Sequence, residues 1–270
     1  MNKKLLSVPF LFWSGLFIIV PLLMVFYYGL TDKTGAFTFE NIAAISSPEH
    51  LKALWEAVKL SVLSTIICLV LAYPLAMILC KSGSNKTSFM VLIFILPMWM
   101  NFLLRTFAWL TLLEKTGVIN TLLKLLGLPT MNIINTPGAI VLGMVYNFLP
   151  FMVLPIYNVL IKIDKNVINA ARDLGANPIQ TFMKITLPLT VPGIISGITM
   201  VFVPALTTFI ISTILGGSKI LLIGNVIEQE FTQTGNWHLG SGLSIVLMMF
   251  IIFNMVISAV TDKDGEAQAL

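Results

Sequence analysis

The chain has 270 residues, of which 57% are hydrophobic and 10% are charged, and its formal net charge is +4. A soluble globular domain carries about 25% charged residues, so this composition excludes the soluble class. The basic residues lie in short segments between long apolar blocks and form no basic patch interleaved with aromatic residues, which excludes a nucleic-acid-binding protein.

Six apolar segments are long enough to cross a bilayer as helices, which takes roughly 20 residues each. We predict an all-α integral membrane protein with spans at about 8–30, 60–80, 88–110, 137–160, 185–215 and 242–260. The first apolar block is longer than the hydrophobic part of a secretory signal, which has about 7–15 residues. We therefore expect an uncleaved first span, with residues 1–270 forming a single transmembrane domain.

Six spans place both termini on one side, and the basic residues indicate which side. If the N-terminus is inside, nine basic residues lie in inner segments and six in outer loops. The inner set is Lys3, Lys4, Lys81, Lys86, Lys162, Lys165, Arg172, Lys184 and Lys263, and the outer set is Lys33, Lys52, Lys59, Lys115, Lys124 and Lys219. Because positive residues favour the cytoplasmic side, we predict that both termini are cytoplasmic.

Neither the cysteines nor the histidines indicate a site. Cys68 and Cys80 belong to one apolar segment and, as helical residues, lie about 18 Å apart, too far for a disulfide. His50 and His238 lie in different loops without the spacing of metal ligands. The chain also lacks a Gly-x-x-x-x-Gly-Lys-Ser/Thr phosphate loop. We expect this chain to bind no metal or cofactor, and any ATP to bind a partner.

The stretch 164–186 differs from the other polar segments because it predicts two short helices. Asp164 or Asn166 can cap the first helix, and Gly175 is placed to end it in the left-handed conformation that glycine accepts. Asn177 can cap the second helix, with Pro178 in its first turn.

The first of these helices is amphipathic. Helical spacing places Val167, Ala170, Ala171 and Leu174 on one face and Asn169, Arg172 and Asp173 on the other. Two interpretations fit this pattern. The helix lies on lipid headgroups, or its small residues allow a second protein surface to approach closely. The pattern alone leaves both open.

The run Asn169-Ala-Ala-Arg-Asp-Leu-Gly175, followed after ten residues by Thr186-Leu-Pro188, resembles the EAA signature of permease subunits of ABC importers. In that family the segment is the coupling helix, which docks into a cleft of the cytoplasmic ATPase. The resemblance assigns ATPase coupling to Asn169, Ala170, Ala171, Arg172, Asp173, Leu174 and Gly175. Asn169 stands where the family has Glu, so a charge-assisted contact becomes a neutral hydrogen bond or is lost.

The span pattern, the long loop after the first span and the place of the signature are similar to the type I importer arrangement, with a core region at about 57–261. Further motifs are most similar to the PotB-like permeases of spermidine/putrescine importers. They are Leu96-Pro97-Met-Trp99, Leu104-Arg105-Thr-Phe-Ala-Trp109, Val145-Tyr146-Asn-Phe-Leu-Pro150-Phe, and Gly216-Gly217 with Leu222-Ile-Gly-Asn225-Val-Ile.

The resemblance implies a subunit of the bacterial inner membrane that transports solute and does no chemistry itself. It also implies a second, PotC-like permease, two cytoplasmic ATPase subunits that bind ATP-Mg, and an extracytoplasmic substrate-binding protein. The alternatives are a type I importer permease for another small solute, such as an anion, a metal chelate or an amino-acid-like compound, and a membrane channel without an ATPase.

Polyamines are cations, yet the apolar blocks contain no carboxylate, so aromatic rings are the expected contacts in the path, each worth about 0.5–2 kcal/mol. The candidates are Trp99, Trp109, Tyr146, Phe148 and Phe209. Glu228 and Glu230 in the last outer loop are candidates for attracting cations or contacting the binding protein. Packing and plain solvation are the competing interpretations. Arg105 either reaches the membrane interface or pairs with a partner subunit.

Overall fold

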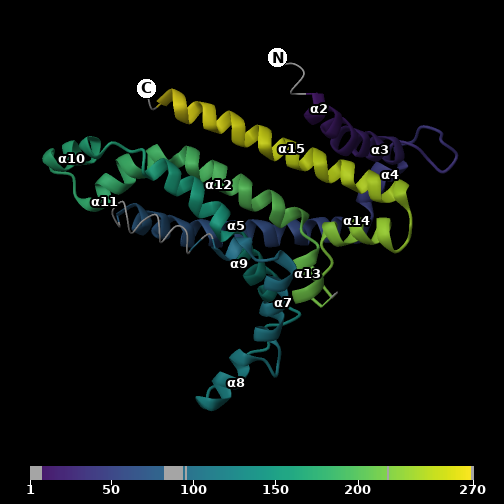
Figure 1. Cartoon of the computed structure of the whole chain (residues 1–270), viewed down its shortest axis with the longest axis horizontal. Coiled ribbons are helices and arrows are strands. Elements are labelled where there is room, and N and C mark those ends of the chain that lie inside the picture. The colour runs from purple at the N-terminus through teal and green to yellow at the C-terminus, as the bar shows by residue number, and fades with distance from the viewer. Residues whose placement is uncertain (1–7, 82–93, 95, 218, 269–270) are drawn as a thin grey trace.

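The computed structural model describes residues 8–81, 94, 96–217 and 219–268, and its regular elements are helices, apart from an isolated β-bridge between Thr31 and Phe37 (Figure 1). Five helical stretches of this described part are long and apolar enough to cross a membrane. They consist of α2 (Val8–Ser14), η1 (Gly15–Ile19) and α3 (Val20–Gly29); α5 (Pro48–Lys81); α9 (Pro137–Leu160); α11 (Pro178–Thr181), η4 (Phe182–Thr186) and α12 (Leu187–Thr207); and α15 (Trp237–Gln268).

Shorter helices join these stretches or stand beside them. They are α4 (Glu40–Ala43), η2 (Ala44–Ser46), η3 (Leu96–Trp99), α7 (Phe102–Leu113), α8 (Val118–Leu125), α10 (Lys165–Asp173), α13 (Ile210–Leu215) and α14 (Ile223–Thr232). In Figure 1, α5, α12 and α15 run along the length of the molecule, α10 and α11 lie at one end, and α4 and α14 lie toward the other.

The second long helix begins at Pro48, so the expected polar loop up to Lys59 is wrong. Ser47 precedes the helix, and its side-chain oxygen accepts a hydrogen bond from the His50 backbone N–H at 3.4 Å. Pro48 follows, with Glu49 in the first turn. A serine cap, a proline and an acidic residue in this order favour a helix start, and here they outweigh the charged residues that follow.

The predicted span at about 88–110 lies partly outside the described residues, so the count of six spans stays a prediction. Within the described part, one continuous helix up to residue 110 is wrong, because η3 ends at Trp99 and α7 begins at Phe102. The Asn101 side chain accepts from the backbone N–H groups of Leu103 at 2.8 Å and Leu104 at 3.3 Å. An asparagine that satisfies the first donors of a helix starts a new one.

The predicted span at 185–215 is also interrupted. It begins earlier, at Pro178, and α12 ends at Thr207. Thr208 has extended backbone, with φ −66° and ψ 135°, and α13 starts two residues later. The Thr207 hydroxyl donates to the Val203 carbonyl at 3.1 Å, a local bond that competes with continued helix. The break lies inside an apolar run, and no charged residue in that run marks its position.

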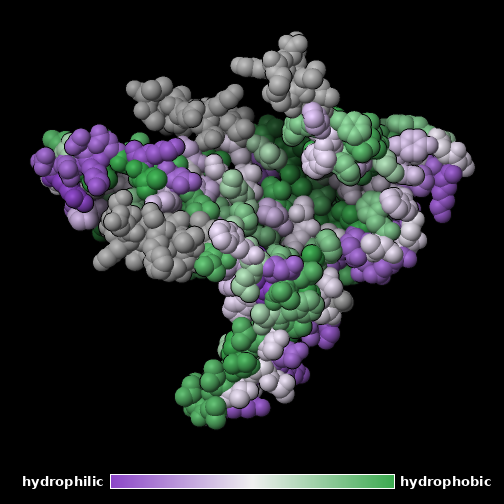
Figure 2. Space-filling view, viewed as in Figure 1, coloured by the Kyte–Doolittle hydropathy of each residue, from purple (hydrophilic) through white to green (hydrophobic). Residues whose placement is uncertain are grey.

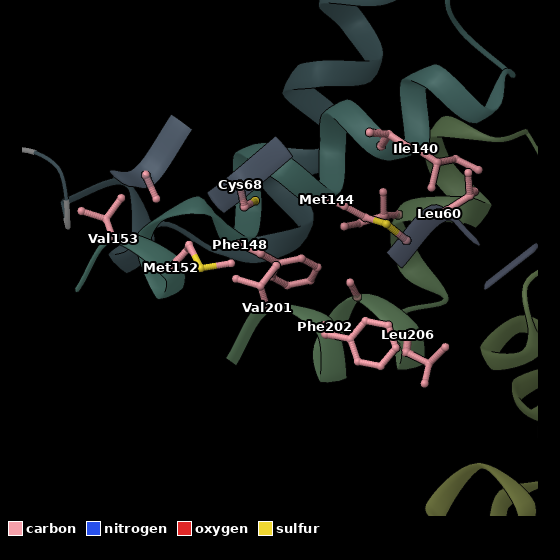
Figure 3. Close-up of a cluster of buried hydrophobic side chains, with 14 of the residues drawn as sticks. Leu60, Cys68, Ile140, Met144, Phe148, Met152, Val153, Val201, Phe202 and Leu206 are labelled. Atoms are coloured by element: carbon pink, nitrogen blue, oxygen red, sulfur yellow. The ribbon is translucent and has the colours of Figure 1, made fainter. Parts of the chain in front are cut away.

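The core lies around α9, which packs against α5 and α12. Figure 3 shows Met144, Phe148 and Met152 of α9 among side chains of both neighbours. Small residues let α12 approach closely, since an added Cβ at Gly193 would lie 2.9 Å from the Pro155 carbonyl oxygen, and one at Gly197 would meet Met152. Small residues four apart are typical of close helix packing in membranes.

The first long helix is held to the rest of the molecule at its C-terminal end. His238 Nδ1 lies 2.7 Å from the Thr31 carbonyl and 3.0 Å from that of Tyr28. Both partners are acceptors, so Nδ1 carries the proton. Asn41 adds a hydrogen bond to Thr31 O at 2.9 Å. His50 likewise lies 2.7 Å from the Ala44 carbonyl through Nδ1. Each histidine side chain thus holds a backbone carbonyl group in place through its Nδ1.

Candidate functional site

The α10–α11 segment is built by local backbone signals. Asp164 is the N-cap of α10, with its side chain accepting from the Asn166 N–H at 2.9 Å, which decides between the two predicted caps. Gly175 has φ +83°, and its N–H donates to the Arg172 carbonyl at 2.8 Å. The prediction that Gly175 ends the helix in the left-handed conformation is confirmed.

Two reciprocal hydrogen bonds between Asn177 and Gln180 fix the turn into α11. The Asn177 side chain accepts from the Gln180 N–H at 2.8 Å, and the Gln180 side chain accepts from the Asn177 N–H at 3.0 Å. This capping box confirms the predicted cap at Asn177 with Pro178 in the first turn. The caps satisfy backbone groups at the starts of both helices without a partner.

Large apolar side chains of this segment face outward. Leu174 is 89% exposed, more than any other large hydrophobic residue of the described part, and Ile179 is 74% exposed. Val167 and Ala170 are also exposed, whereas Ala171, one turn after Val167 on the same side of α10, is buried. Figure 2 shows this end as mainly hydrophilic, with hydrophobic patches among the polar side chains.

Taken together, the α10–α11 segment is a preformed projection with exposed apolar side chains at its turn. Such a projection can insert into a cleft of another protein, because the entropy of ordering it has already been lost on folding.

A second candidate site lies where α12 breaks. A cavity of about 480 Å³ is lined by Phe209 from the break, by Glu228 and Phe231 from α14, and by apolar side chains of α15. The Glu228 Oε1 accepts from the Thr232 hydroxyl at 2.9 Å. Two rings and a carboxylate at one cavity can hold an organic cation. The structure thus brings together Phe209 and Glu228, two candidates that no sequence pattern had paired.

Asn225 holds this break in place. Its Oδ1 accepts from the Ser212 hydroxyl at 2.6 Å and from the Leu222 N–H at 3.1 Å. Its Nδ2 donates to the Phe209 carbonyl at 3.1 Å and to the Thr213 hydroxyl at 2.8 Å. With 3% of its surface exposed, Asn225 fixes the start of α14 to the N-cap and the middle of α13. Asn225 was not among the predicted site residues, although an asparagine inside an apolar run is a usable signal of a buried polar contact.

The remaining residues that were predicted to line the substrate path lie in different parts of the molecule. The rings of Trp109 on α7 and Tyr146 on α9 meet edge to face, with centroids 5.3 Å apart. Trp99 is 79% exposed on η3. Phe148 is 7% exposed and belongs to the hydrophobic core, so its assignment to the path is replaced by a packing role. Glu230 does not line the cavity of Glu228; its side chain accepts from the Thr234 hydroxyl at 2.8 Å.

Comparison with known proteins identifies the class. Residues 86–262 match the family described as binding-protein-dependent transport system inner membrane component. The chain is 38% identical over 252 residues to the spermidine/putrescine transport system permease protein PotB of Haemophilus influenzae, covering 89% of this chain and 88% of that one. It is 37% identical over 243 residues to PotB of Escherichia coli K12, covering 87% and 88%.

Solved structures agree on the fold. A bacterial ABC transporter involved in the import of the acidic polysaccharide alginate contains a chain that superposes with a TM-score of 0.79 at 18% identity, covering 95% of this chain and 94% of that one. Fold and sequence together define a multi-pass permease subunit of an ABC importer, with the type I arrangement. The chain belongs to the family of binding-protein-dependent transport system inner membrane components.

Proposed function

We propose that this chain is the PotB-type half of an ATP-driven polyamine importer in the bacterial inner membrane, with both termini cytoplasmic. The observation that carries this proposal is the identity of 38% to a spermidine/putrescine permease along almost the whole chain. The chain transports and does not hydrolyse ATP, because it contains no phosphate loop.

The cavity at the α12 break supports a cationic cargo. Polyamines alternate alkyl stretches with ammonium groups, and the cavity offers the rings of Phe209 and Phe231 beside the Glu228 carboxylate. The C-terminal end of α12 also points its last carbonyl groups toward the break, an arrangement that favours positive charge. Discontinuous helices of this kind form the substrate sites of several membrane transporters.

The partners follow from the same proposal. A second, PotC-like permease completes the path, and a binding protein delivers the polyamine from outside. Two ATPase subunits hold ATP-Mg on the cytoplasmic side, where the α10–α11 segment inserts Leu174 and its neighbours into a cleft of one ATPase. ATP-driven closure of the ATPases then moves this rigid segment and, through η4, the long helix that continues into α12.

A reconstituted complex tests the cargo. The chain, its second permease and the ATPase are placed in lipid nanodiscs with the binding protein, and ATP hydrolysis is measured with and without spermidine or putrescine. We expect either polyamine to stimulate hydrolysis. If neither does, while another small solute bound to the same binding protein stimulates it, the complex is an importer for that solute and the polyamine proposal is wrong.

A further inference from the structure

The stretch that joins the α10–α11 segment to the body of α12 is a weakly bonded piece of helix. From Phe182 to Thr186 the chain forms the π-helical turn η4, and the Leu187 N–H donates to the Phe182 carbonyl, five residues back. Pro188 and Pro192 follow in α12, and a proline donates no backbone hydrogen bond. A π-turn and prolines are typical places for a helix to bend, so this stretch can absorb a displacement of the segment before it.

One side chain of α5 contacts this stretch on both sides of the π-turn. The Tyr73 ring meets the Phe182 ring edge to face, with the centroids 5.4 Å apart and the ring planes at 85°. The Tyr73 hydroxyl oxygen lies 2.7 Å from the Thr190 hydroxyl oxygen. Phe182 is the first residue of η4, and Thr190 lies about one helical turn beyond its last residue. Tyr73 therefore bridges the π-turn from the neighbouring helix, and we call these two contacts the Tyr73 clasp.

The direction of the hydroxyl bond follows from the other neighbours of Thr190. The Thr190 hydroxyl oxygen lies 3.0 Å from the Thr186 carbonyl and 2.9 Å from the Leu187 carbonyl, and a carbonyl can only accept. The single hydrogen of the Thr190 hydroxyl goes to these carbonyls, so Tyr73 donates to Thr190. The hydrogen bonds thus form a chain from α5, through the Thr190 side chain, to the backbone at the end of the π-turn.

The clasp is buried and is anchored to the core. Thr190 is 0% exposed and Tyr73 is 9% exposed, so water does not compete for the bond between their hydroxyls. Helix α5 packs against both α9 and α12, and Tyr73 belongs to the hydrophobic core cluster. The stretch of helix that can bend most easily is therefore tied, through one side chain, to the core of the molecule.

We propose that Tyr73 is a positioning residue for the coupling of ATP hydrolysis to transport. Its clasp makes η4 and the start of α12 move together with α5, so that a displacement of the α10–α11 segment reaches the cavity at the α12 break. Without the clasp, bending at the π-turn absorbs part of that displacement. The proposal rests on the proposed function, because it requires an ATPase that displaces the segment. Tyr73 acts through the helices and touches neither the cargo nor the ATPase.

The amount of polyamine transported per ATP hydrolysed tests this role, measured on the full complex in proteoliposomes with the binding protein. We expect Tyr73→Phe, which keeps the ring against Phe182, to lower this ratio by about threefold, the factor that corresponds to an average hydrogen bond between helices in a membrane. Thr190→Val should have the same effect, and the double variant should add little, because each change removes the same bond. Thr190→Ser keeps a hydroxyl and should retain the wild-type ratio.

Tyr157→Phe is the matched control, since it removes the hydroxyl of a tyrosine that packs against the same core from α9 and lies outside the clasp. A wild-type ratio for Tyr73→Phe would overturn the proposal. So would a parallel fall of transport and hydrolysis that leaves the ratio unchanged, because a role in stability alone lowers the amount of active complex and not the transport per ATP.

Spin labels on the two helices follow the clasp without any cargo. They are placed at Ile78 on α5, 59% exposed, and at Met183 on η4, 53% exposed, with exposed Cys80 replaced by serine. In the full complex we expect ATP to leave the distance between the labels unchanged while Tyr73 is intact, and to broaden the distribution of distances in Tyr73→Phe. A distance that changes with ATP while Tyr73 is intact would overturn the clasp. Failure of polyamines to stimulate hydrolysis by the wild-type complex would contradict the proposed cargo alone.

Discussion

The α10–α11 segment and the α12–α13 break are both places where helical chain is interrupted, yet they are stabilised in opposite ways. At the first, Asp164, Asn177 and Gly175 satisfy the backbone locally and leave Leu174 exposed. At the second, one buried amide, that of Asn225, is bonded to the Phe209 carbonyl, which precedes α13, and to the Ser212 hydroxyl within α13. Local capping leaves apolar side chains exposed at the α10–α11 turn, whereas the buried amide holds a break beside a cavity.

The largest expected effect comes from removing that amide. Asn225→Leu removes the acceptor of the buried Leu222 N–H and one of the hydrogen-bond partners of the Ser212 hydroxyl. A buried polar group left unsatisfied costs about 1–3 kcal/mol. We expect polyamine uptake to be abolished and the folded complex to melt earlier. Uptake by proteoliposomes and thermal unfolding measure this, with Asn132→Leu, at an exposed position outside both regions, as control. Wild-type uptake by Asn225→Leu would show that polyamine transport does not need the hydrogen bonds of Asn225 at the break.

Gly175 tests the other region. Its φ of +83° is strained for a β-branched residue and accessible to asparagine. An added Cβ there would contact no other part of the chain within 4 Å, so the strain is in the backbone.

We expect Gly175→Val to lower ATPase stimulation by about tenfold, through a conformational cost on the order of 1–2 kcal/mol, and Gly175→Asn to leave it nearly unchanged. Stimulated ATP hydrolysis in nanodiscs measures both. Equal activity of the two variants would show that the left-handed turn is not needed for coupling.

Glu228 gives a smaller effect, because its carboxylate is only partly buried. Glu228→Gln should raise the KM for spermidine by about threefold and leave kcat unchanged, as expected when a contact of modest strength is lost. Glu230→Gln is the matched control, since Glu230 does not line the cavity. The same KM for both variants would show that the Glu228 carboxylate does not contact the transported cation.

The smallest effect is expected at Asn169, which stands at the Glu position of the EAA signature that this segment resembles. Asn169→Glu changes a neutral hydrogen bond into a charge-assisted one, so coupling should stay the same or strengthen by less than about fivefold. The ATP concentration dependence of stimulated hydrolysis measures this change. Loss of the ATPase from the purified complex would mean that this face of α10 has been assigned to the wrong contact.

The two regions also differ in how far they were predictable. Gly175 and Asn177 act on backbone within a few residues, and sequence analysis placed both correctly. The start of α5 was missed although Ser47 and Pro48 signal it locally, because the charged residues after them suggested a loop. The break after Thr207 depends on Asn225, whose hydrogen-bond partners no local pattern identifies.

The path itself was the least predictable part. An aromatic residue in an apolar run has the same pattern whether it packs in the core, as Phe148 does, or lines a cavity, as Phe209 does. Only the packing of α9 against its neighbours separates the two. A half-pathway also lacks the second permease, so the positions of Trp99 and Tyr146 in the complete path depend on a surface outside this chain.

The most direct test of the account is the accessibility of position 174 with and without the ATPase. A Leu174→Cys chain, with exposed Cys80 replaced by serine, is labelled with a maleimide in nanodiscs, and Phe39→Cys, 62% exposed on the other side of the molecule, serves as the reference. The account predicts that the ATPase slows labelling at position 174 by about tenfold or more, as burial of a docked apolar side chain requires, and leaves position 39 unchanged. Equal labelling rates at position 174 with and without the ATPase would contradict it.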